Sequence, residues 1–74
     1  MAASPARYEI CVRGLLGETM LQAFPGFRAA TRDGQTFLTG ELSDQAALQG
    51  LLAQIGALGL ELVRVRLLPS NLKL

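Results

Sequence analysis

Few residues of this chain have the types and spacing that catalysis needs. The sequence contains one Cys, Cys11, and no His. A nucleophile such as Cys11, Ser43 or Ser70 therefore lacks its usual base, and the predicted elements place no two carboxylates across one cleft. We predict that the protein is not an enzyme and that it has no catalytic residues, no metal site and no cofactor.

Cys11 lies in a segment where polar and apolar residues alternate, from Tyr8 to Arg13. We interpret it as a small apolar residue on the less buried face of a strand. A heavy-metal chaperone would need two cysteines in a C-x-x-C loop, and this segment has one. The thiol has no partner for an internal disulfide, and a reduced thiol is typical of the cytoplasm. The first residues lack the apolar core of a signal peptide, so we expect a cytoplasmic location.

Two glycines, Gly14 and Gly17, follow this segment and could present backbone N–H groups to an anionic ligand. The spacing is much less specific than a P-loop, and the Lys of a P-loop is missing. The alternative is a tight connection between a strand and a helix, for which glycine is equally suited.

Composition limits the architecture and the partners. The chain has 74 residues, of which 50% are hydrophobic and 18% charged, with a net charge of +1. A chain of this size has a small core, and neither a disulfide nor a zinc site is available to stabilise it, so we expect oligomerisation. The weakly polar run from Leu48 to Leu60 is shorter than the roughly 20 residues that cross a bilayer, and we expect no membrane partner.

The first half of the chain predicts a strand, a helix and a hairpin. Alternation around Ile10 indicates the strand, and apolar residues at near-helical spacing from Leu16 to Phe24 predict a helix of about two turns, which ends before Pro25. Asp33 and Gly34 then form the dipeptide favoured in a two-residue type I′ turn.

This turn fixes the register of the hairpin, because cross-strand partners share a face. The predicted pairs are Arg32 with Gln35, Thr31 with Thr36, Ala30 with Phe37, Ala29 with Leu38, and Arg28 with Thr39. The predicted core face comprises Phe27, Ala29, Thr31, Thr36 and Leu38. Phe37 is placed on the opposite face with Arg28, Ala30, Arg32 and Thr39.

The second half predicts one helix and one strand. Ser43 or Asp44 can cap a helix that carries leucines at i, i+3 and i+4 spacing, which we place from Asp44 to Leu58. Val63, Val65 and Leu67 then alternate with Arg64, Arg66 and Leu68 until Pro69 ends the strand. We expect a flexible tail at residues 1–6, one domain at 7–69 and a second tail at 70–74.

The order strand, helix, strand, strand, helix, strand resembles the ferredoxin-like plan. That resemblance implies an α+β domain with a four-stranded antiparallel sheet, in the order 4-1-3-2, and both helices on one face. The segment from Gly14 to Gly17 is loosely similar to the corresponding loop of ACT regulatory domains. More narrowly, the chain is similar to small stand-alone bacterial proteins of this plan that have no assigned activity, and the fold alone gives no function.

Two surfaces are candidates for binding. The first is the outer face of the sheet, where an aromatic residue has arginines around it, a composition enriched at protein interfaces. Its residues are Cys11, Arg13, Arg28, Arg32, Phe37, Arg64 and Arg66. The second is the back of the second helix, where small residues permit close approach by another helix. Its residues are Ala46, Gly50, Ala53 and Ala57.

These observations favour a non-enzymatic, homo-oligomeric interaction module, such as an adaptor or regulatory subunit, that binds itself, with another protein as a further candidate partner. One alternative is an ACT-like sensor that binds a small ligand at Gly14 and Gly17. The other is a weak binder of single-stranded RNA. We expect no functional nucleic-acid site, because only Phe37 could stack on a base and a nearly neutral domain releases few counterions.

Overall fold

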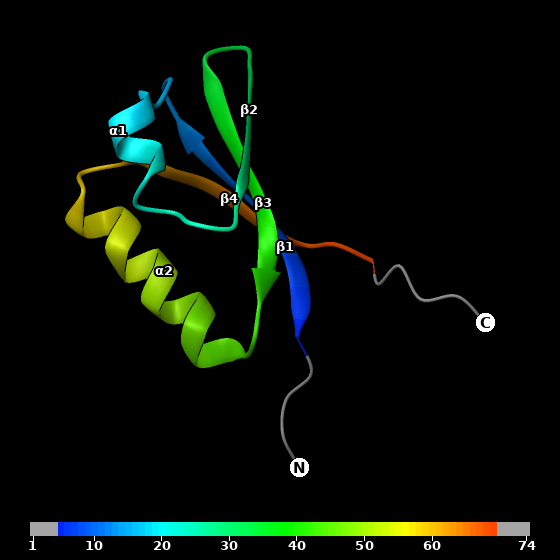
Figure 1. Ribbon diagram of the computed structural model, residues 1–74. Coiled ribbons are helices and arrows are strands. Elements are labelled where there is room, and N and C mark those ends of the chain that lie inside the picture. The colour runs from blue at the N-terminus through cyan, green and yellow to red at the C-terminus, as the bar shows by residue number, and fades with distance from the viewer. Residues whose placement is uncertain (1–4, 70–74) are drawn as a thin grey trace.

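Four strands form one open antiparallel sheet in the computed structural model, which describes residues 5–69 (Figure 1). The strands are β1 (Ala6–Arg13), β2 (Arg28–Arg32), β3 (Gln35–Leu42) and β4 (Leu62–Leu67), and the helices are α1 (Glu18–Leu21) and α2 (Gln45–Ala57). The strand order β2-β3-β1-β4 is the predicted 4-1-3-2 order, counted from the other edge. Strands β2 and β4 are therefore the two edges. The predicted tails fall largely outside the described residues.

The hairpin between β2 and β3 has the predicted turn and register. Asp33 and Gly34 both have positive φ, at 55° and 74°, as a type I′ turn requires. The five cross-strand pairs of the hairpin are those given by the turn, from Arg32 opposite Gln35 to Arg28 opposite Thr39. The turn chemistry is therefore sufficient to set which side chains share a face.

The core lies between the sheet and the two helices, which both pack on one side of it (Figure 1). Its sheet side is made by Ile10, Val12 and Leu38, and α2 contributes Leu51 and Ile55. Phe24, from the segment after α1, completes the buried cluster. Alternation along β1 and β3 thus delivers apolar side chains to the helix side of the two central strands.

Helix α2 begins and ends as the sequence predicts. The Asp44 carboxylate accepts a hydrogen bond of 2.8 Å from the backbone N–H of Ala47, which satisfies one of the free donors of the first turn. Leu58 is the C-cap, and Gly59 follows with φ of 77°. A residue in this conformation ends a helix, and glycine adopts it without steric cost.

Helix α1 is shorter than predicted. It spans four residues, Glu18–Leu21, instead of the two turns expected from Leu16 to Phe24. Its N-cap, Gly17, offers no side chain to cap the first turn. After Leu21 the chain continues in tighter turns, in which the N–H of Phe24 donates to the carbonyl of Leu21. These turns bury Phe24 without a second helical turn, so apolar spacing alone overestimated the helix.

The core side of both edge strands is more exposed than predicted. Ala29 and Thr31 of β2 belong to the core-side face but are exposed, as are Val63 and Leu67 of β4. A short α1 and a single 13-residue α2 cover mainly the central strands. In β4 the register against β1 also shifts between Cys11 and Val12, which leaves an irregularity beside Val63.

Thr36 is a buried polar residue that joins β3 to the loop after β1. Its hydroxyl donates to the carbonyl of Gly14 at 2.7 Å and accepts from the N–H of Leu16 at 3.3 Å. The N–H of Gly14 also donates to the carbonyl of Gly34 at 2.7 Å. These bonds hold the loop against the hairpin.

Replacing Thr36 with Val should lower the free energy of unfolding by about 1–2 kcal/mol, because two backbone groups lose their partner while the volume is kept. Urea denaturation followed by circular dichroism measures this change. Thr31→Val is the matched control, since Thr31 lies opposite Thr36 but is exposed. Equal stability of both variants would show that the Thr36 hydroxyl does not anchor the loop.

Candidate functional site

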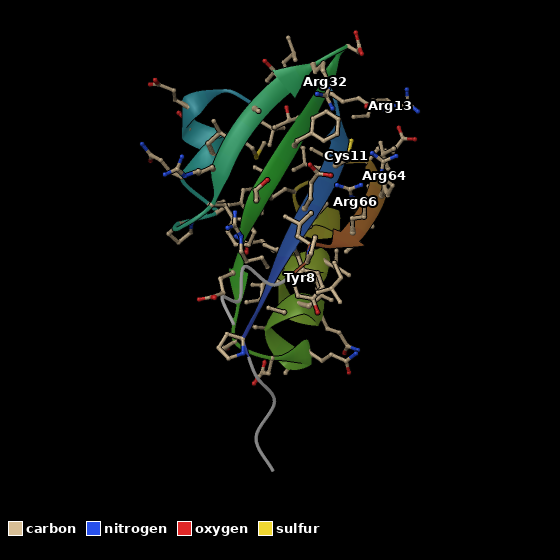
Figure 2. The ribbon with its side chains drawn as sticks, turned by 90° about the vertical axis from the view of Figure 1, so that its right-hand side faces the viewer. Tyr8, Cys11, Arg13, Arg32, Arg64 and Arg66 are labelled. Carbon is tan, nitrogen blue, oxygen red and sulfur yellow. The ribbon has the colours of Figure 1, made fainter. Side chains whose placement is uncertain are left out.

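All six arginines of the chain lie on the outer face of the sheet, away from the helices. The pairing places Arg13 and Arg32 on either side of Gln35, Arg64 beside Cys11, Arg66 beside Glu9, Arg28 beside Thr39, and Arg7 beside Glu41. Figure 2 looks onto this face and shows Arg13, Arg32, Arg64 and Arg66 around Cys11. We call the set Arg7, Arg13, Arg28, Arg32, Arg64 and Arg66 the arginine face. Sequence analysis found five of them and did not include Arg7.

Two of the six arginines are used in ion pairs that link β1 and the β4 region. Arg13 Nε lies 3.0 Å from Glu61 Oε1, and Arg66 Nε lies 3.4 Å from Glu9 Oε1. Within residues 5–69 the other four guanidinium groups form no ion pair. Two of these four, Arg28 and Arg32, belong to edge strand β2, so this edge carries two positive charges that no carboxylate of the described residues neutralises.

The centre of the arginine face is closed by its own side chains. Phe37 is on the predicted face but only 8% exposed, and the Arg32 guanidinium lies 4.8 Å from the centroid of its ring. Cys11, expected on the less buried face, is 1% exposed. Arg32 thus covers the Phe37 ring, and the cross-strand neighbours of Cys11 are Phe37 and Arg64. The buried thiol fits the interpretation of Cys11 as an apolar residue.

Two shallow depressions lie side by side at the β2 side of this face. The first is lined by Arg28, Ala29, Ala30, Phe37 and Thr39. The second is lined by Arg7, Gly26, Arg28, Thr39, Gly40 and Glu41. Arg28 borders both. Ala30 has the smallest side chain on this stretch of the face and stands between Arg28 and Arg32, so the first depression lies beside two cations.

The glycine loop is shaped by the fold. Gly14 has φ of 96°, which favours glycine, and its N–H and carbonyl are both bonded within the chain. Gly17 is the N-cap of α1 and has open space where a side chain would be. The N–H of Leu16 between them is taken by Thr36. The small-ligand alternative at this loop stays a prediction.

The back of α2 is exposed, as predicted. Ala46, Gly50, Ala53 and Ala57 are all accessible to solvent, and a methyl group added at Gly50 would meet nothing within 4 Å. Gln54 ties the helix to the segment after α1, because its Nε2 donates to the carbonyl of Ala23 at 3.1 Å. The helix carries no charged residue between Gln45 and Ala57.

A further surface, which sequence reasoning missed, runs along β4 on the helix side. Leu58, Leu62, Val63 and Leu67 are exposed large apolar residues, with Leu62 at 43% and Leu67 at 63%. We call these four residues the apolar strip. Alternation had marked Val63 and Leu67 as core positions. The exposure could have been inferred from the predicted strand order. That order places β4 at an edge of the sheet, and two short helices cannot cover every strand.

A family model matches residues 7–66, and its description is a domain of unknown function, DUF8691. The chain belongs to this family. The match includes all four strands except the first residue of β1 and the last residue of β4, together with both helices. No curated protein and no solved structure matches the chain significantly. The DUF8691 description carries no activity, so the function has to be argued from the surfaces.

Residues 5–69 contain neither a membrane-spanning helix nor a cluster of metal-ligating side chains. The helices described there are too short to span a membrane. The same part of the chain contains no group of three or more His, Cys, Asp and Glu side chains arranged to hold a metal ion.

Phe37→Ala should lower the free energy of unfolding by about 3 kcal/mol, because the ring is buried within its own chain. Arg32→Gln should cost less than about 1 kcal/mol, since it removes the contact with the ring and leaves the ring in place. Thermal or urea unfolding of both variants measures this ranking. A stable Phe37→Ala monomer with weakened self-association would show that Phe37 is an interface anchor.

Proposed function

We propose that this DUF8691 domain is a non-enzymatic interaction module of ferredoxin-like plan whose first partner is a second copy of itself. The observation that carries the proposal is the apolar strip. Among residues 5–69, four of the five exposed large apolar residues lie in the segment from Leu58 to Leu67. Exposed apolar residues that gather on one side of a domain are typical of interaction sites, whereas scattered ones are ordinary.

Two copies are more compatible with packing through their apolar strips than with edge-to-edge pairing of their β4 strands. Antiparallel pairing of two β4 strands about Val65 would set Arg64 opposite Arg66 of the other copy, and like charges opposite one another are unfavourable. Packing the helix side of β4 against the same side of another copy buries the leucines and leaves the arginines in water. The resulting interface is isologous, with the same patch used by both copies.

Such a dimer needs a larger contact area than four side chains provide. A standard stable interface buries about 800 Å² on each partner. The strip begins at Leu58, the C-cap of α2, next to the exposed Ala57. Because α2 carries no charge, it can border this interface without leaving a buried ion unpaired. The helix back thus borders the apolar strip through Ala57, and Gly50 lies outside the strip.

The side chains that could act as nucleophile or base are few, which supports a role other than catalysis. The one thiol is buried, and the sequence has no His to act as a base. Binding is the activity that the exposed apolar and basic surfaces can perform.

Changing Leu62 and Leu67 together to Thr should convert the dimer to a monomer at tens of micromolar. Thr retains the preference for a strand but removes apolar contact area from the strip. Size exclusion with light scattering gives the mass directly. Leu15→Thr is the control, because Leu15 is 68% exposed but lies outside the strip. A wild-type mass of one chain, or an unchanged dimer in the double variant, would contradict the proposal.

Gly50→Ala tests whether the back of α2 is the centre of the interface. Alanine should stabilise the folded domain by about 0.5–1 kcal/mol, because it favours the helix and the space around Gly50 is open. The dimer should persist, since Gly50 lies outside the apolar strip. Thermal unfolding and light scattering measure the two effects, and loss of the dimer would move the interface to the helix back.

A further inference from the structure

We infer that the open edge of β2 binds an extended segment of another protein in which two acidic residues flank an apolar residue at alternate positions. The site consists of Arg28, Ala30 and Arg32 on the arginine face and the backbone of Ala29 and Thr31. We call it the β2 edge site. It lies at the opposite edge of the sheet from the apolar strip, so it does not depend on dimerisation.

The backbone of β2 is available for another strand. All five residues from Arg28 to Arg32 are exposed, and β3 lies on one side of β2 only. The two-residue turn makes Arg32 and Gln35 a hydrogen-bonded pair, and such pairs recur at every second residue. The N–H and carbonyl groups of Ala29 and Thr31 therefore point away from β3. An added strand can pair with both residues, as in other cases of β-strand addition.

Side chains on the arginine face define the sequence of that strand. Residues paired with Arg28, Ala30 and Arg32 would share their face, since opposed residues point the same way. Arg28 and Arg32 form no ion pair within the described residues, and an Arg guanidinium matches a carboxylate with two parallel bonds. A depression lined by Arg28, Ala29, Ala30, Phe37 and Thr39 lies at Ala30, so a side chain paired with Ala30 would lie over it and is expected to be apolar.

The same side chains argue against other occupants. Two β2 strands paired about Ala30 would set Arg28 opposite Arg32 of the second copy, so self-association at this edge is electrostatically unfavourable. Single-stranded nucleic acid usually stacks bases on exposed aromatic rings. Here the ring of Phe37 is 8% exposed and Arg32 lies against it. An extended segment with acidic residues can pair with the free backbone groups of β2 and can neutralise its two arginines.

The test is a fluorescence-anisotropy titration of the full chain with a short fluorescein-labelled peptide, at physiological salt. In the peptide, Glu, Val and Glu occupy alternate positions with Thr between them. We expect a dissociation constant of about 0.1 mM or tighter. A peptide with Lys in place of both Glu residues should not bind. Absence of binding by the Glu peptide, or equal binding of both peptides, would overturn the inference.

Two charge-reversal variants separate the β2 edge site from general attraction to the arginine face. Arg28→Glu should weaken binding about tenfold, because one ion pair becomes a repulsion. Arg64→Glu makes the same change in net charge on the same face at the other edge, and should leave the dissociation constant within about twofold, as screening limits distant charges. Equal loss in both variants would contradict a site at β2.

Two further measurements identify the mode of binding. In amide hydrogen exchange, the N–H groups of Ala29 and Thr31 should become protected when the peptide binds, while those of β4 do not change. Exchange without added protection at Ala29 and Thr31 would rule out strand addition. A single-stranded oligonucleotide that binds more tightly than the peptide, and is weakened equally by Arg28→Glu and Arg64→Glu, would assign the arginine face to nucleic acid.

Discussion

The register between β1 and β3 is the constraint on which the rest of the structure depends. The two strands pair over eight residues each, from Ala6 opposite Leu42 to Arg13 opposite Gln35. Because successive side chains alternate between faces, this one register sends Ile10 and Leu38 to the helices and the arginines to the other side. A shift by one residue would bring arginines into the core, so burial and charge specify the same alignment.

Local chemistry made much of this architecture predictable. The Asp33-Gly34 turn, the Asp44 cap of α2 and the alternation along β1 each involve neighbouring residues, whose effects can be inferred without tertiary contacts. From them followed the hairpin register and five of the six members of the arginine face, whereas the strand order came from the resemblance to the ferredoxin-like plan. The same information placed the back of α2 on the surface.

How much of the sheet the helices cover was not predictable from the periodicity of apolar residues. Alternation tells which face a side chain shares, but not whether a helix lies over that part of the face. Ala29 and Leu67 are on the core side by alternation and exposed because the helices do not reach the edges. Phe37 and Cys11 show the reverse case, since both are buried on the face opposite the helices, where Arg32 lies over the Phe37 ring. Helix coverage decided the first outcome and the covering arginine side chain the second, and both depend on tertiary contacts that alternation alone does not specify.

The arginines of the two edge strands have a consequence for solubility. An open sheet with two unpaired edges is a template for stacking into aggregates. Here each edge carries a pair of guanidinium groups, Arg28 and Arg32 on β2 and Arg64 and Arg66 on β4, which repel an identical edge. That repulsion acts over about 8 Å at physiological ionic strength and about 3 Å at 1 M salt. The colloidal stability of this domain is therefore coupled to the salt concentration around it.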